Sequence, residues 1–287
     1  MKLFVVLLLL GMFSLSVAEV VDSFKKDCPQ FFFKNNNRVI TPTVFTNNKY
    51  KQICQFYEGE YWFATLYDTK FKIPVYSAYT YSFIKSRDIK DDYWKIEPQV
   101  SKPLFLKSVK YFIICCTLTT PTYIQVSFLQ WFNPSLKDSG YTKGHVFPKS
   151  YGQSDQQKES TFTLTNAAPK TQENNTAWGE QVEIPMLNEI KGNCDQNVFV
   201  YIVTGVVPGD NTWLPIKRGG KTIKQGVNIP RYFWAAYSCK SKNNNNIESN
   251  AYIADQSTAL PPENLTVDRL NIRLTKLYNV KQFSVFG

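Results

Sequence analysis

His145 is the one histidine in the chain, and it stands in a setting that can support catalysis. It lies in the segment 141–148, Tyr-Thr-Lys-Gly-His-Val-Phe-Pro. An imidazole exchanges a proton near neutral pH, so it can serve as a general base. Gly144 permits a close approach that a side chain would block, and Lys143 brings positive charge beside the ring. A solitary histidine is more often a packed or surface residue than a catalyst. Whether His145 is catalytic therefore depends on which other residues accompany it.

Downstream of His145 come side chains that could hold a metal or order a site: Asn166, Asn174, Asn175 and Glu183. Asn166 belongs to a Thr-Asn-x-x-Pro sequence, and the asparagine pair precedes Trp178. Taken singly, these residues have ordinary interpretations, such as a helix N-cap, a loop asparagine or a solvated helix glutamate. Their order along the chain is what points to function.

The ordered pattern is Gly-His, then Thr-Asn-x-x-Pro, then Asn before Trp, then a hydrophobic residue before Glu. This resembles the signature of the DNA/RNA non-specific endonucleases, and the closer match is to the secreted vertebrate endonuclease-domain-containing-one-like proteins. Shorter matching fragments lie at 21–24, 52–55, 63–69, 73–80, 203–208 and 227–230. The resemblance implies an α+β fold of the ββα-metal (His-Me finger) type, with a central, mainly antiparallel sheet flanked by helices.

The resemblance also implies roles for individual residues in phosphodiester hydrolysis. His145 is the general base, and Lys143 and Glu183 complete the catalytic group, with Glu183 fixing the waters of the metal. The residues that organise the site are Thr142, Gly144 and Asn166. Lys149 and Lys170, together with Lys143, hold the phosphate backbone of the substrate. Contacts mainly to phosphates predict cleavage of DNA and RNA that is nearly independent of sequence.

A single asparagine is the metal ligand that the resemblance implies. One hydrated Mg²⁺, with Mn²⁺ as the alternative, suits such an oxygen donor because the ion keeps most of its waters. We place the ligand at Asn174, although counting forward from Asn166 without a gap gives Asn175. Asn174-Asn175-Thr176 is also an N-glycosylation sequon, and a glycan on Asn174 would block that ligand. A second sequon begins at Asn264.

One departure from the family pattern keeps an alternative function open. The family commonly has Asp-Arg before Gly-His, where this chain has Thr142-Lys143. Lysine keeps the charge but not the planar fork of arginine, and threonine removes a carboxylate. The alternative is therefore a catalytically impaired relative that binds nucleic acid or another polyanion outside the cell. A secreted structural protein unrelated to nucleic acid would require the ordered motif to be coincidence.

The first 18 residues read as a secretory signal peptide. Lys2 precedes an apolar run, 3–10, and Ser16-Val17-Ala18 resembles a cleavage site. The apolar run is too short to favour a membrane anchor. We therefore expect a single domain over residues 19–287, secreted and extracellular.

The chain is basic, with 33 Lys and Arg against 23 Asp and Glu and a formal net charge of +10. Such an excess favours polyanionic partners, including nucleic acid, heparin-like glycans and acidic membranes. Many secreted proteins are simply basic, so charge alone does not choose among these partners.

Six cysteines in the mature part predict disulfides, because the secretory route is oxidising. Spacing leaves the connectivity open. Our assignment pairs Cys28 with Cys54 and Cys194 with Cys239, each closing a moderate loop, and leaves the neighbours at 115 and 116 unplaced. A zinc site is disfavoured, since the sequence has no Cys-x-x-Cys and its histidine is far from any cysteine.

Segments rich in aromatic and β-branched residues predict the strands that carry the site. We expect a hairpin from 61–67 and 71–83 and further strands at 197–207 and 227–238. Helices are expected at 177–190, with a kink or break at Pro185, and at 267–278. The segment 242–250 reads as a solvated loop.

The apolar segment 104–132 has two interpretations, a pair of core strands or an insertion into the fold. Lysines and a proline interrupt it, which disfavours a membrane span.

Overall fold

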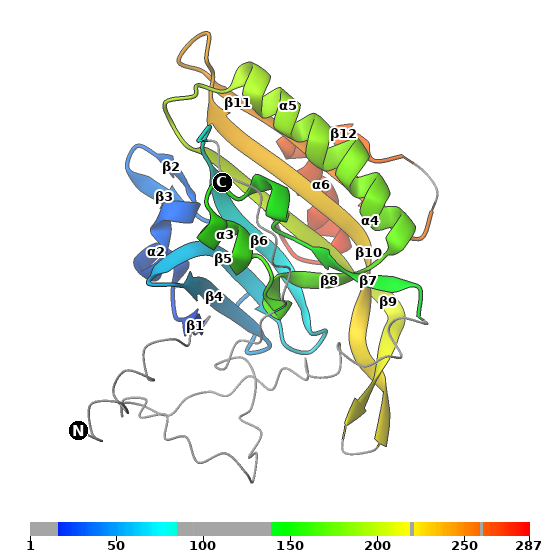
Figure 1. Ribbon diagram of the computed structural model, residues 1–287. Helices are drawn as coiled ribbons and strands as arrows, with labels where there is room; N and C mark the ends of the chain where they lie inside the picture. The colour runs from blue at the N-terminus through cyan, green and yellow to red at the C-terminus, as the bar shows by residue number, and fades with distance from the viewer. Residues whose placement is uncertain (1–16, 85–93, 95–138, 219–220, 259–260) are drawn as a thin grey trace, which may run out of the picture.

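The computed structural model describes residues 17–84, 94, 139–218, 221–258 and 261–287 (Figure 1). Its centre is an eight-stranded sheet with the order β1-β4-β5-β6-β9-β10-β11-β12. The strands are β1 (Val17–Val21), β4 (Tyr50–Tyr57), β5 (Glu60–Asp68), β6 (Ile73–Tyr81), β9 (Val200–Arg218), β10 (Lys221–Lys240), β11 (Ile247–Asp255) and β12 (Glu263–Leu265). Every neighbouring pair in it is antiparallel, which agrees with the predicted sheet type.

Both faces of this sheet are covered, so its strands are apolar on both sides. One face carries α4 (Gln172–Trp178), α5 (Ile184–Asn193) and a small hairpin, β7 (Tyr141–His145) with β8 (Ala167–Thr171) (Figure 1). The other face carries α2 (Phe24–Asp27) and α6 (Val267–Leu277). Successive residues of β10 alternate between the two cores, as Phe233 and Trp234 do.

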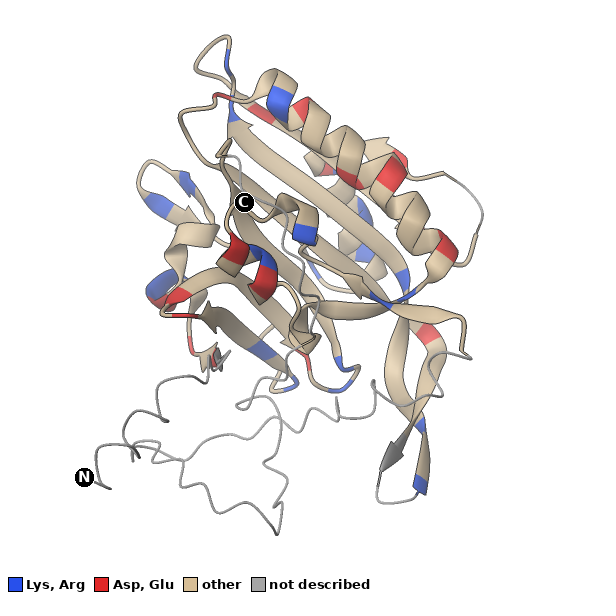
Figure 2. Cartoon of the chain, viewed as in Figure 1, with Lys and Arg blue, Asp and Glu red and all other residues tan. Residues whose placement is uncertain are grey.

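The predicted elements are found with shifted ends. Residues 61–67 and 71–83 correspond to the β5–β6 hairpin. The predicted strand 197–207 begins three residues before β9, and 227–238 falls within β10, which pairs with β9. Both strands run beyond the sheet as a projecting hairpin (Figure 1). Basic residues lie on this hairpin as well as on the body of the protein (Figure 2). The predicted helix at 267–278 corresponds to α6.

The helix predicted at 177–190 begins earlier and does not break at its proline. It comprises α4, a π turn η6 (Gly179–Glu183) and α5 in direct succession. Pro185 stands in the first turn of α5, where proline is tolerated. The irregularity therefore lies before the proline, as a wider helical turn.

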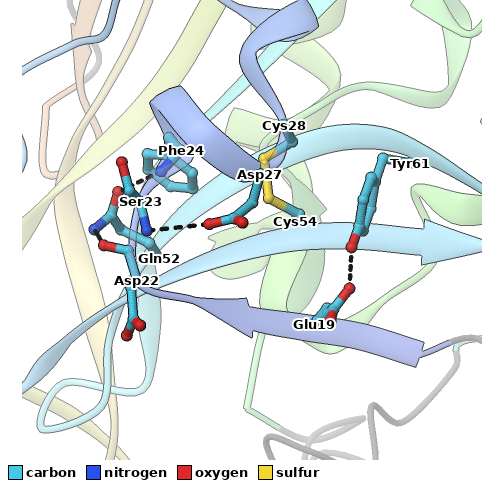
Figure 3. The surroundings of a disulfide bond; sticks show 9 residues. All are labelled: Glu19, Asp22, Ser23, Phe24, Asp27, Cys28, Gln52, Cys54 and Tyr61. Carbon is cyan, nitrogen blue, oxygen red and sulfur yellow. Dashed lines mark hydrogen bonds between the residues drawn. A yellow bond between two sulfur atoms is a disulfide. The ribbon is translucent and has the colours of Figure 1, made fainter.

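Two disulfides join the predicted cysteine pairs. Cys28–Cys54 fastens α2 to β4, beside the hydrogen bonds that Gln52 makes with Phe24 and Asp22 (Figure 3). Cys194–Cys239 ties the end of α5 to β10. Both assignments are confirmed.

The loop prediction for 242–250 is wrong in its second half, because Ile247–Asp255 is β11 and residues 247–250 pair with β10. The exposed turn is limited to 242–246. Residues 1–16, the segment 104–132 and the cysteines at 115 and 116 lie outside the described residues. Among the helices of the described part, none is long and apolar enough to cross a bilayer. Cleavage before Glu19 would leave Glu19–Val21 paired with β4.

Candidate active site

The β7–β8 hairpin divides the predicted site residues between its two faces. Thr142 pairs with Lys170 and Gly144 with Ala168, so these four point to the same face. Ala168 is packed in the core against the main sheet. His145, with its neighbour Lys143 two residues back, therefore points to the opposite face.

Aromatic rings enclose the imidazole of His145. Its ring centroid lies 4.6 Å from Trp94 and 4.7 Å from Phe162, whose ring meets it edge-on. The Lys143 Nζ lies 5.4 Å from the Trp94 ring, and the Lys149 Nζ lies 5.7 Å from the Phe162 ring. The structure thus gathers His145 and two predicted cations around one aromatic cluster. Burial lowers the pKa of Lys143, and a bound anion would act in the opposite direction.

Asn166 is fully buried and holds the segment that follows His145. Its Oδ1 accepts from the Phe147 backbone N–H at 2.8 Å, and its Nδ2 donates to the Phe147 carbonyl at 3.0 Å. Nδ2 also donates to the Thr161 carbonyl, and the Val146 N–H donates to the Asn166 carbonyl. The amide therefore fixes the segments that contain Phe147 and Thr161, next to the His145 cluster, which supports an organising role.

A chain of buried hydroxyls links this amide to the main sheet. The Ser77 Oγ of β6 donates to Asn166 Oδ1 at 3.0 Å and lies 2.9 Å from Thr65 Oγ1 of β5. Next to it, the Gln55 amide of β4 donates to Thr165 Oγ1. Two strands of the sheet, β4 and β6, thus bond to the 3-10 turn η5 (Leu164–Asn166) through polar side chains, and β5 is linked to it through Ser77.

Gly144 is required by close packing on the sheet side of the hairpin. A Cβ at this position would lie 2.9 Å from Lys170 Cβ and 3.2 Å from the Ala168 carbonyl oxygen. Since one of these neighbours is backbone, a side chain would push β7 away from β8 next to His145.

Glu183 lies at the end of the π turn, close to the segment after β7. The Tyr151 hydroxyl donates to the Glu183 carbonyl at 2.6 Å, and Tyr151 ends the 3-10 turn η4 (Lys149–Tyr151). Burial raises the pKa of Glu183, while the positive charge of Lys170 acts to lower it. The helix backbone at Glu183 and the segment that follows His145 are therefore joined through η4.

Asn174 and Asn175 point to different sides of α4. The Asn174 Nδ2 donates to the Gln256 carbonyl at 3.0 Å, on the side where Ala177 and Trp178 line a pocket. Asn175 is rotated from it by about 100° around the helix axis.

The π turn decides which asparagine shares a side with Glu183. In a regular α-helix, the side chains of Asn175 and Glu183 would leave the helix in directions about 80° apart around its axis. The wider turn η6 lies between them and reduces this rotation, because a π turn takes more residues. Asn175 and Glu183 therefore lie at nearly the same angle around the helix axis. This geometry favours Asn175 over Asn174 as the asparagine on the same side of the helix as Glu183.

Lys170 does not lie where a phosphate contact was predicted. Its side chain is 1% exposed and faces the sheet side of the hairpin, with Nζ 4.1 Å from the Phe233 ring and 5.1 Å from the Trp178 ring. The family resemblance implied a place for it beside the cleft, in contact with the substrate backbone. The alternation of β8 turns it inward instead.

The donor set fits a weakly held, hydrated ion better than a cage. Among the described residues, no cluster of three or more His, Cys, Asp or Glu could enclose a metal. One asparagine oxygen with a carboxylate on the same helix side fits an ion that keeps most of its waters.

Sequence reasoning missed several residues of this site. Trp94 and Phe162, which flank the imidazole, and Tyr151 and Ser77, which anchor the site, carried no motif. For Ser77, a signal existed in its polar character within an apolar strand, 73–81. For Trp94 we find none in the sequence.

Replacing Asn166 with Ala should destabilise the protein by about 2–4 kcal/mol, because it leaves several buried backbone groups without partners. Ser77→Ala removes one bond to the same amide and should cost about 1 kcal/mol. Urea unfolding followed by tryptophan fluorescence measures both. Equal unfolding midpoints for wild type and Asn166→Ala would contradict the organising role.

Residues 42–286 match the family model of the DNA/RNA non-specific endonucleases. The endonuclease domain-containing 1 proteins of Homo sapiens and Mus musculus are 30% and 29% identical over 213 residues, or 74% of this chain. The chain spans 39% and 38% of their lengths.

A solved structure of an EndoG/EndoGI complex aligns with 91% of this chain and 91% of its own, at 15% identity. Its TM-score is 0.47. The family model, in contrast, covers most of the chain and contains the β7–β8 hairpin and the following helices. The chain belongs to the DNA/RNA non-specific endonuclease family.

Proposed function

We propose that this protein is a secreted, Mg²⁺-dependent endonuclease that hydrolyses phosphodiester bonds of DNA and RNA without sequence preference. The observation that carries the proposal is the position of His145, held by the Asn166 network and flanked by Lys143 and Lys149. Family membership supports the reaction class.

His145 would take a proton from the attacking water. Trp94 and Phe162 restrict the orientation of its ring, so that less conformational freedom is lost when substrate binds. Lys143 and Lys149 would contact the phosphate oxygens as point charges, which suits binding that reads the backbone and not the bases. Lys170 is left out of this role because it is buried.

Asn175 would hold the metal through its side-chain oxygen, and Glu183 would orient water on the same side of the helix. When bound, Mg²⁺ supplies positive charge that stabilises the leaving oxygen. The helical phase set by η6 supports Asn175, and the hydrogen bond to Gln256 occupies the Asn174 amide. A glycan on Asn174 would lie on the other side of α4 and would spare this ligand.

Two disulfides support an oxidising compartment and therefore secretion. Asn264 is exposed on the edge strand β12, where a glycan could be accommodated.

Plasmid nicking by the purified chain tests the activity. We expect cleavage that EDTA abolishes and that His145→Ala reduces by at least about 100-fold, since general base catalysis contributes that much or more. Lys25→Ala, on α2 at the opposite face of the sheet, is the matched surface control and should cleave like wild type. Equal cleavage by wild type and His145→Ala would refute the assignment. Binding to DNA without cleavage would favour the catalytically impaired alternative.

The two asparagines give a separate prediction. Asn175→Ala should lower the cleavage rate by about 100-fold or more, because an oriented charge is lost at the leaving oxygen. Asn174→Ala should retain most of it, because this side chain bonds to Gln256 on the other side of α4. Rates at increasing Mg²⁺ measure both variants. The opposite ranking would return the ligand to Asn174.

A further inference from the structure

The projecting hairpin of β9 and β10 carries a concentration of positive charge that the proposed catalytic cluster does not use. Between Asp210 and Glu248 the sequence contains no acidic residue, and four of the eight residues at 217–224 are Lys or Arg. Figure 2 shows blue near the end of this hairpin and red only close to its base. We call the described residues 211–218 and 221–226 the basic arm.

Lys221 and Lys224 are the described lysines that the basic arm presents to solvent. Residues 221–225 are all exposed. Within the described part of the chain, neither lysine takes part in an ion pair. The backbone also pairs Lys221 directly with Arg218 on the other strand. Because like charges at opposed positions of a sheet repel, this arrangement is relieved when an anion approaches.

The base of the basic arm is fixed to the body of the protein by the turn between β5 and β6. The Asn228 backbone N–H donates to the Phe71 carbonyl at 3.0 Å, and the Lys72 Nζ donates to the Gly226 carbonyl at 2.5 Å. The Phe71 ring packs on Trp213, with centroids 5.5 Å apart. The arm therefore projects in a set direction, which lowers the conformational cost of binding along it.

The projecting part begins beside the hairpin that carries the catalytic cluster. The Gln256 side-chain amide donates to the carbonyls of Pro169 on β8 and Pro230 on β10, at 3.3 Å and 2.7 Å. Pro169 lies within about 10 Å of His145 along the β7–β8 pair, and Lys221 is about 30 Å of strand beyond Pro230. The end of the arm is therefore no more than about 50 Å from His145, or about 15 base pairs of duplex.

We propose that the basic arm is a second nucleic-acid contact, which binds the phosphate backbone of a duplex up to about 15 base pairs from the bond held at His145. Lys221 and Lys224 would act as point charges on successive phosphates, so the contact would not depend on base sequence. An extended arm of cations suits a ligand whose charges repeat along its length, such as a polynucleotide. The inference rests on the proposed function for the choice of nucleic acid as that ligand.

Fluorescence anisotropy with a labelled DNA duplex of about 30 base pairs in EDTA tests the arm without any need for turnover. The double variant Lys221→Glu, Lys224→Glu should raise the Kd about tenfold or more at about 50 mM salt, and should reduce the salt slope of log Kd by about 2, because two phosphate contacts are lost. The matched control is Lys25→Glu, Lys26→Glu, which changes the net charge equally on α2. It should change the Kd by less than about twofold.

Circular dichroism checks that both double variants are folded, and a glutamate at 221 across from Arg218 favours folding of the arm. An equal loss of binding in the two double variants, or no loss in the arm variant, would overturn the proposal. Weakened heparin binding with unchanged duplex binding would make the arm a glycan site and would also refute it.

Cleavage of the same duplex in Mg²⁺ separates the arm from the proposed function. The arm variant should raise the KM and keep a kcat close to that of wild type, because the residues around His145 are intact. A lower kcat with unchanged KM would contradict a role in binding. Arm-dependent binding in a protein that cleaves nothing would refute the proposed hydrolysis and support the arm.

Discussion

The buried amide of Asn166 is the contact on which the geometry of this site depends. Its four side-chain hydrogen bonds bind the residues after His145, the preceding turn at Thr161 and the hydroxyl of Ser77 on the sheet. A fully satisfied buried network of this kind is rigid, because any displacement leaves backbone groups without partners in a low-dielectric interior. The imidazole therefore stands at the end of a short strand whose position is set by the main sheet, and small errors of position are costly in catalysis.

The second constraint is the π turn between α4 and α5. It changes the helical phase, so that Asn175 comes into line with Glu183, while Asn174 remains on the side of the pocket. One helix thus presents two chemically different sides. Asn174 lines the pocket, and the backbone carbonyl of Glu183 contacts η4. The carboxylate of Glu183 also lies near enough to the buried ammonium of Lys170 for the two charges to interact.

Much of the scaffold could be predicted from the sequence, because aromatic and β-branched content and turn residues are local signals. The β5–β6 hairpin and the long strands followed from them. The two disulfide pairs agree with an assignment that the spacing of the cysteines left open. The site was harder to predict. The inward direction of Lys170 depends on its register with Thr142, the choice between two adjacent asparagines depends on a π turn, and the packing of Trp94 on His145 joins distant segments. None of these has a periodicity or motif in the sequence.

The central claim is that His145 serves a metal site built on the Asn175–Glu183 side of the helix. Crystals of the protein soaked in Mn²⁺ test it most directly, because the ion is visible by anomalous scattering without any need for turnover. We expect an anomalous peak within coordination distance of the Asn175 side-chain oxygen, about 2.0–2.3 Å. A peak at Asn174 in the pocket, or none near Asn175 at saturating Mn²⁺, would contradict it.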